Sequence, residues 1–137
     1  MDNYGAHVRL VFRDFPLSFH QDAQLAHEAA NCANDQGKFW EFHDKLFANQ
    51  KALKEASLKQ YAVDLQLNAD EFNGCLASGR HKPVVTQEQR EGQAVGVTGT
   101  PAFFINGRFL NGAQPYENFA SIIEEELELK GVKRGGS

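Results

Sequence analysis

Hydrophobic residues near the start of the chain alternate with polar ones. Val8, Leu10 and Phe12 are each separated by one residue. This period of two predicts a strand over residues 8–12 with one face well buried. Pro16 follows and is expected to end the extended segment.

From Asp22 onward the apolar residues recur at intervals of three and four, which is the spacing of a helix with one buried face. We expect two helices at 22–34 and 39–47, a third beginning near Ser57, and a short fourth ending at Gly79. Ser57 is a candidate N-cap, and Asn68 with Glu71 forms a variant of the capping box. A more polar helix is expected over 84–95, and a last one after Pro115.

The stretch 102–112 has the pattern of a hairpin. Phe103, Phe104 and Ile105 form a run too short for a helix, and Asn106-Gly107 is the strongest two-residue turn signal. Residues 108–111 form the returning strand. Pro101, just before the hairpin, lacks a backbone N–H, and its preceding peptide bond can be cis at modest cost. Read alone, such a proline is a turn or edge device.

Composition narrows the class of protein. The chain has 137 residues, 42% of them hydrophobic and 23% charged, as expected for one compact domain. The net charge is −4 without a basic block, so no nucleic-acid partner is expected. No apolar run approaches the about 18 residues of a membrane span, and the first residues do not resemble a secretory signal.

The segment Gly-Val-Thr-Gly-Thr-Pro-Ala-Phe-Phe-Ile-Asn-Gly at 96–107 closely resembles the cis-proline loop and hairpin of DsbA-like thiol–disulfide oxidoreductases in the thioredoxin superfamily. Residues 13–17, Arg-Asp-Phe-Pro-Leu, resemble the end of a strand in that family. Residues 29–33 and 37–47 resemble its helical insertion. The resemblance covers nearly all of residues 7–130. It implies that Thr100 and Pro101 form the substrate-binding loop, in which the residue before the proline presents its backbone to an extended polypeptide. It also suggests a periplasmic or extracytoplasmic location.

The implied fold is α/β: an incomplete thioredoxin-like fold with a helical insertion at about 21–95 and a small sheet of about three strands. We expect a single domain over 1–137 with a flexible tail at 131–137. In the family, a strand and a helix carrying Cys-x-x-Cys precede the segment that begins here at residue 7. We therefore expect the redox half of the fold to be absent from this chain.

The chain has two cysteines, Cys32 and Cys75, and no Cys-x-x-Cys. Neither lies at a helix N-terminus, where a thiolate is stabilised, so no catalytic role is expected. They are either two small core residues or a structural disulfide between two helices of the insertion. The resemblance to DsbA-like proteins, some of which carry a second disulfide in this subdomain, implies the disulfide as an alternative. Histidines at 7, 20, 27, 43 and 81 form no ligand pattern, so we expect no metal and no cofactor.

Loss of the family's central strand would leave the strands at 8–12 and 103–105 without a partner between them. We expect the sheet to close by direct pairing of these two strands or by a strand borrowed from another chain, and we favour a homodimer.

The function implied is that of a thioredoxin-fold relative of disulfide oxidoreductases, without dithiol activity in this chain. The alternatives are a non-catalytic peptide-binding or assembly module that uses the Thr100–Pro101 loop, and a truncated product with no retained activity.

Overall fold

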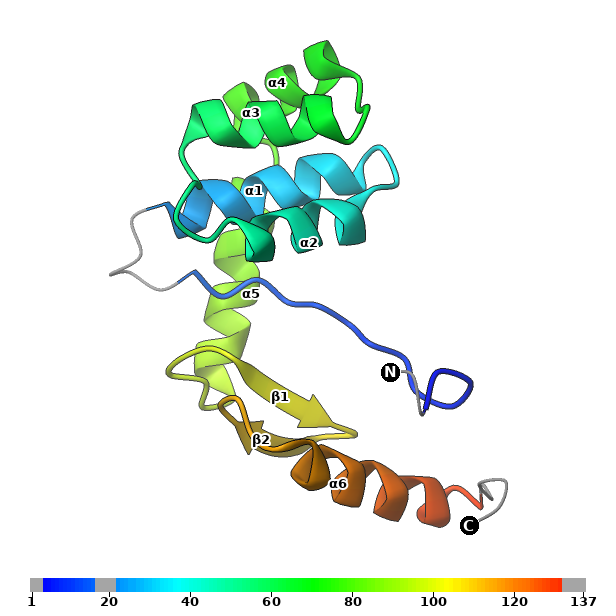
Figure 1. Cartoon of the computed structure of the whole chain (residues 1–137). Helices are drawn as coiled ribbons and strands as arrows, with labels where there is room; N and C mark the ends of the chain where they lie inside the picture. Colours follow the sequence, from blue (N-terminus) through cyan, green and yellow to red (C-terminus); the bar gives the residue numbers. More distant parts are fainter. Residues whose placement is uncertain (1–3, 17–21, 132–137) are drawn as a thin grey trace. The chain divides into compact units, whose positions relative to one another are not determined.

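The computed structural model describes residues 4–16 and 22–131. Their order is five helices, a two-stranded hairpin and a final helix (Figure 1). The chain divides into two compact units, Asp14–Gly96 and Met1–Arg13 with Val97–Ser137. The single domain expected over 1–137 stays a prediction. The tail expected at 131–137 lies outside the described residues except for Gly131.

The helical unit contains five helices, which are α1 (Ala23–Asn34), α2 (Phe39–Ala48), α3 (Glu55–Asp64), α4 (Ala69–Ser78) and α5 (Lys82–Ala94). Helix α1 is central, because it contacts each of the other four (Figure 1). Its small residues permit this close approach: Ala29 and Ala33 are fully buried.

Two aromatic side chains form the centre of this unit. Phe42 of α2 and Phe72 of α4 are both fully buried, with ring centroids 5.5 Å apart. Tyr61 of α3 packs against Phe42 at 6.3 Å, and its hydroxyl donates to the carbonyl of Ala52 at 2.6 Å. Nearly all residues of the buried core cluster lie in α1–α4, so the main hydrophobic core is that of the helical unit.

Helix boundaries follow local signals, with one correction. The Asn68 side chain accepts a hydrogen bond from the backbone N–H of Glu71 at 3.0 Å, which confirms the predicted N-cap of α4. Gly79 ends this helix with φ at 66°, a left-handed conformation that suits glycine. Ser57 is not a cap: α3 already begins at Glu55, with Lys54 in extended conformation before it.

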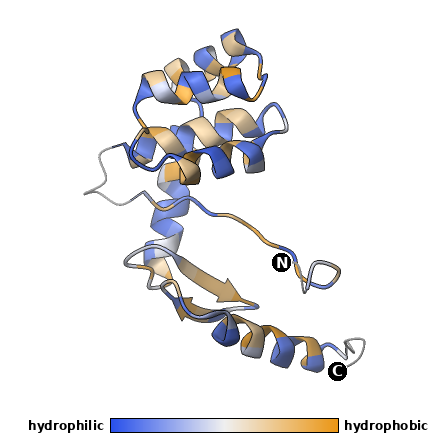
Figure 2. Cartoon of the chain, in the orientation of Figure 1, coloured by the Kyte–Doolittle hydropathy of each residue, from blue (hydrophilic) through white to orange (hydrophobic). Residues whose placement is uncertain are grey.

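The second unit contains the hairpin and the last helix. Strands β1 (Ala102–Ile105) and β2 (Arg108–Asn111) pair antiparallel, and both Asn106 and Gly107 have positive φ at the turn, as a type I′ hairpin requires. Figure 2 shows the hairpin as a largely hydrophobic ribbon. Helix α6 (Tyr116–Leu129) packs on one face, where Phe119 meets Phe103 edge-on at 4.8 Å.

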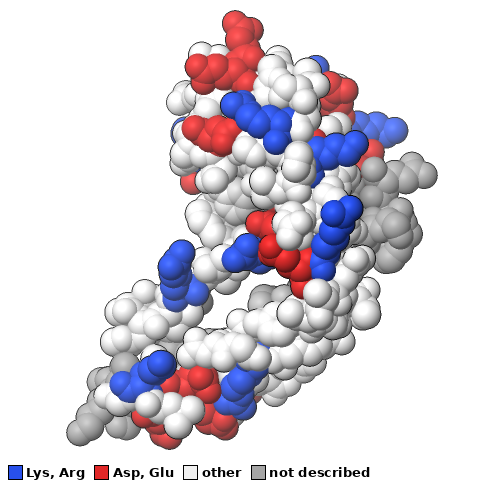
Figure 3. All heavy atoms as spheres, turned by 180° about the vertical axis from the view of Figure 1, so that it is seen from behind, with Lys and Arg blue, Asp and Glu red and all other residues white. Residues whose placement is uncertain are grey.

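Ion pairs also connect the hairpin to α6. Arg108 Nη1 lies 2.7 Å from Glu125 Oε2 and 3.6 Å from Glu126 Oε2. The hydrogen bond to Glu125 raises the pKa of Arg108. On the face of the molecule in Figure 3, acidic and basic side chains are interleaved.

The third strand expected over residues 8–12 is absent from the described sheet, which has two strands rather than about three. These residues form no helix or strand, and Leu10 and Val11 are both 52% exposed. An alternating sequence of apolar and polar residues forms a strand only when a neighbouring strand forms hydrogen bonds with its backbone N–H and C=O groups. Direct pairing of 8–12 with 103–105 is likewise absent from the described residues.

Candidate functional site

The proline loop before β1 is exposed. The Thr100–Pro101 peptide bond is cis, and both residues lie at the surface. The carbonyl of Pro101 accepts from the N–H of Gly112 at 2.9 Å, which continues the hairpin by one residue pair. The backbone of Thr100 forms no hydrogen bond within the described part of the chain.

Strand β1 has an open edge. Hydrogen-bonded pairs alternate along an antiparallel ladder, so the Pro101–Gly112 pair fixes Phe103 and Ile105 as residues that bond toward β2. The N–H and C=O groups of Ala102 and Phe104 consequently point to the opposite edge. No strand pairs with that edge among the described residues.

An aromatic pair lies beside this edge. Phe104 and Phe109 are directly opposite each other in the hairpin, with ring centroids 5.0 Å apart, and each is 45% exposed. They occupy the face opposite to Phe103, which is turned toward α6. The edge therefore combines free backbone groups with an adjacent apolar surface.

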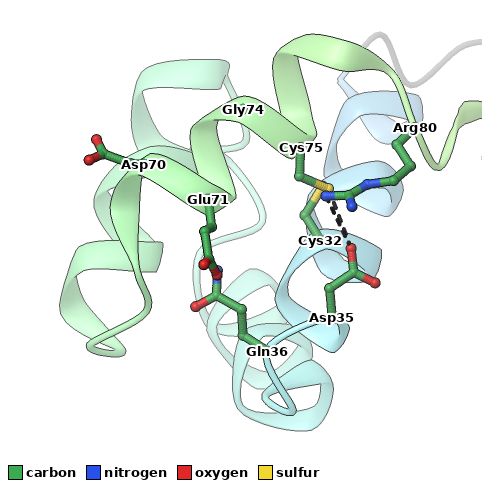
Figure 4. A pocket seen from close by; sticks show the side chains of 8 residues that line it. All are labelled: Cys32, Asp35, Gln36, Asp70, Glu71, Gly74, Cys75 and Arg80. Carbon is green, nitrogen blue, oxygen red and sulfur yellow. Dashed lines mark hydrogen bonds and ion pairs between the residues drawn. A yellow bond between two sulfur atoms is a disulfide. The ribbon is translucent and has the colours of Figure 1, made fainter.

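A second site lies in the helical unit, where Cys32 of α1 and Cys75 of α4 are joined by a disulfide with Cα atoms 5.9 Å apart. Their residues are 1% and 4% exposed. Both nevertheless line a pocket of about 390 Å³ (Figure 4). Its other lining residues are Asp35, Gln36, Asp70, Glu71, Gly74 and Arg80.

The carboxylate of Asp35 connects the groups around the disulfide. Its Oδ2 lies 2.7 Å from His81 Nε2 and 3.6 Å from Arg80 Nη2. The same oxygen is 3.6 Å from the sulfur of Cys75. Figure 4 shows Asp35 pointing toward the sulfurs and Arg80, whereas Asp70 points away from them.

The sequence suggested four site residues. Thr100 and Pro101 belong to the unit with the hairpin, whereas Cys32 and Cys75 belong to the helical unit. Sequence reasoning missed Asp35 and His81. The available signals were weak: Asp35 follows Cys32 by three residues, one helical turn on the same face, and His81 follows Cys75 by six.

His43, in α2, has a polar partner and three aromatic neighbours. His43 Nδ1 lies 3.1 Å from the carboxylate of its neighbour Asp44, and its ring contacts those of Phe39, Trp40 and Phe47. The His43 side chain is 22% exposed and therefore has both a polar and an aromatic environment. His20 lies outside the described residues.

None of the helices described between residues 22 and 131 has the length and apolar character needed to cross a bilayer.

Comparison with known proteins gives two results. A family model described as thioredoxin matches residues 2–125. The chain is also 41% identical over 117 residues to a protein named Na(+)/H(+) antiporter NhaA 3 from Salinispora tropica, and 40% identical over 117 residues to Na(+)/H(+) antiporter NhaA 1 from Salinispora arenicola. Both alignments cover 85% of this chain and 18% of the relative. The chain thus spans less than a fifth of the length of these curated relatives.

Proposed function

The chain belongs to the thioredoxin family, and from that premise we propose that it is a DsbA-like domain that docks an extended polypeptide segment at the Thr100–Pro101 loop and the open edge of β1. In this mode of recognition, a peptide adds itself to a sheet as one more strand. Main-chain hydrogen bonds supply the affinity, and neighbouring side chains select the sequence.

The observation that carries this proposal is the unpaired edge of β1. Ala102 and Phe104 direct their backbone groups to it, and the backbone of Thr100, at its end, bonds to none of the residues described at 4–16 and 22–131. Exposed, unpaired strand edges attract further strands. The Phe104–Phe109 pair offers apolar contact to one face of an incoming segment.

Dithiol exchange at a Cys-x-x-Cys pair is not part of the proposal, because the chain has no such motif. Thiol–disulfide exchange needs an accessible thiolate and a second thiol that resolves the mixed disulfide. The Cys32–Cys75 pair is buried in the helical unit and has a structural role in this proposal.

The proposal is tested with a labelled insulin B chain whose cysteines are alkylated, used as an extended peptide in fluorescence polarisation. The informative variant is Ala102→Pro, which removes the N–H that points to the open edge and leaves the β1–β2 ladder intact. We expect at least about tenfold weaker binding, equivalent to about 1.4 kcal/mol, the size of one net backbone hydrogen bond.

Asn111→Pro is the matched control. Asn111 lies directly opposite Ala102, and its N–H points to the outer edge of β2. This variant is expected to bind the peptide like the original chain. Equal binding by all three proteins would contradict docking at β1. Light scattering on the same samples checks whether a second copy occupies the edge, as a homodimer would.

The names of the relatives suggest a second candidate function. The similarity covers most of this chain, and the relatives carry the name of a Na(+)/H(+) antiporter. We propose that the domain works as part of, or beside, a membrane protein of that kind. Sequencing the DNA on both sides of the reading frame tests this: we expect adjacent coding sequence with several apolar segments of about 20 residues. A neighbourhood without such segments would remove this candidate.

A further inference from the structure

Four metal-ligating side chains converge where α1 ends, α4 passes and α5 begins. The donor atoms of Cys32, Cys75 and His81 all lie within 4.8 Å of one another. Asp35 joins them, with Oδ2 at 2.7 Å from His81 Nε2 and 3.6 Å from Cys75 Sγ. The two sulfurs are bonded to each other in the structure.

We propose that reduction of the Cys32–Cys75 disulfide converts this cluster into a Zn²⁺ site formed by Cys32, Cys75, His81 and Asp35. The pair then alternates between a disulfide and a metal centre, each of which connects α1 to α4. Two thiolates with an imidazole and a carboxylate are a donor set that suits Zn²⁺.

The distances are compatible with four-coordinate zinc. Zn–S bonds of about 2.3 Å and Zn–N or Zn–O bonds of about 2.0–2.1 Å separate neighbouring ligand atoms by roughly 3.3–3.8 Å in a tetrahedron. Asp35 Oδ2 lies 2.7 Å from His81 Nε2 and 3.6 Å from Cys75 Sγ, and the donor atoms of Cys32, Cys75 and His81 lie within 4.8 Å of one another, so these separations bracket that range. Breaking the S–S bond lets the two sulfurs move apart to their tetrahedral spacing.

The charges also balance. Two thiolates and one carboxylate carry three negative charges against the two positive charges of the ion. The guanidinium of Arg80, at 3.6 Å from Asp35, compensates for the remaining negative charge. The pocket beside the sulfurs gives an ion a route to them, and Glu71 adds a carboxylate to its lining (Figure 4).

The redox step needs a dithiol as reductant, such as dithiothreitol. Its two thiols give up two electrons and become a cyclic disulfide, while the S–S bond of the protein breaks and both cysteines become thiols. Zn²⁺ then displaces one proton from each thiol into solvent. Reoxidation needs a small-molecule disulfide such as oxidised glutathione: two electrons pass from the cysteine thiolates to its S–S bond, which breaks into two thiols, while the Cys32–Cys75 bond forms again and the ion is released.

Co²⁺ is the probe for the first experiment, because tetrahedral cobalt–thiolate complexes absorb in the visible and near ultraviolet. The full chain is reduced with dithiothreitol, freed of reductant by anaerobic gel filtration, and titrated with Co²⁺. We expect saturation at one Co²⁺ per chain, loss of the bands when Zn²⁺ is added, and no bands for the oxidised chain. A reduced, helical chain without these bands would overturn the proposal.

Variants assign the ligands. His81→Ala and Asp35→Ala are each expected to weaken binding at least about tenfold, and Cys32→Ser is expected to reduce the thiolate-to-cobalt absorption. His43→Ala is the matched control, since His43 is paired with Asp44 on α2 in the same unit. Unchanged affinity in His81→Ala would overturn the assignment.

A second measurement covers the case in which reduction unfolds the helical unit. Zn²⁺ is added to the reduced chain, and helicity is followed by circular dichroism. We expect the ion to restore the helical signal and to protect both cysteines from iodoacetamide. Failure on both readouts would overturn the proposal without recourse to the cobalt bands.

Discussion

The carboxylate oxygen Oδ1 of Asp14 lies 2.8 Å from Nδ1 of His27, and Asp14 is only 3% exposed. The second oxygen of Asp14 accepts from the Asn31 amide at 2.8 Å, and its backbone N–H donates to Glu88 at 2.6 Å. Asp14 thus attaches the segment before α1 to two helices of its unit: its buried carboxylate bonds to α1, and its backbone N–H bonds to α5.

Asp14→Ala is expected to lower the free energy of unfolding by about 1.5–3 kcal/mol, because hydrogen bonds to a buried charged group are lost and the partly buried side chains of His27 and Asn31 lose their partner. Urea unfolding followed by fluorescence measures this, since the only tryptophan, Trp40, lies in α2 of the same unit. The control is Asp44→Ala, which removes an Asp–His pair of 3.1 Å whose carboxylate side chain is 79% exposed. A similar loss in both variants would contradict the importance of burial.

Removal of the disulfide should also destabilise the helical unit. Cys32 and Cys75 are separated by 43 residues, and closing a loop of that length in the unfolded chain is worth about 4 kcal/mol on the chain-entropy account. We expect the Cys32→Ala/Cys75→Ala double variant, unfolded in urea with a chelator present, to lose stability on that scale. A loss below about 1 kcal/mol would show that the unfolded chain gains little freedom.

Helix capping distinguishes two polar residues that the sequence alone treats alike. Asn68→Ala should cost about 1 kcal/mol, because the N–H of Glu71 loses its acceptor. Ser57→Ala should be neutral or slightly stabilising, because Ser57 lies inside α3 and alanine favours helix. Thermal unfolding by circular dichroism compares the two, and equal losses would contradict the start of α3 at Glu55.

Reduction of insulin by dithiothreitol tests thiol–disulfide turnover. We expect turbidity to appear at the rate of a sample without protein, because Cys32 and Cys75 are buried and neither lies at a helix N-terminus. Faster reduction that is lost in Cys32→Ser would overturn this expectation and assign the disulfide to catalysis.

Several features could be predicted from the sequence because they depend on neighbours within a few residues. The Asn106-Gly107 turn needs only two residues that tolerate positive φ, and the cap at Asn68 needs only the N–H three residues later. The periodicity that places Ala29 and Cys32 on one face likewise acts within α1. Such local signals correctly located the helices and the hairpin.

Other features were decided by contacts between distant segments. Residues 8–12 alternate like a strand, but a strand needs a partner, and none pairs with them in the described structure. The spacing of Cys32 and Cys75 left a disulfide and two core residues equally open until the packing of α1 against α4 set their Cα atoms 5.9 Å apart. The same packing brought His81 to Asp35 across 46 positions of sequence. Sequence periodicity determines which face of an element is buried, whereas only tertiary packing determines what that face meets.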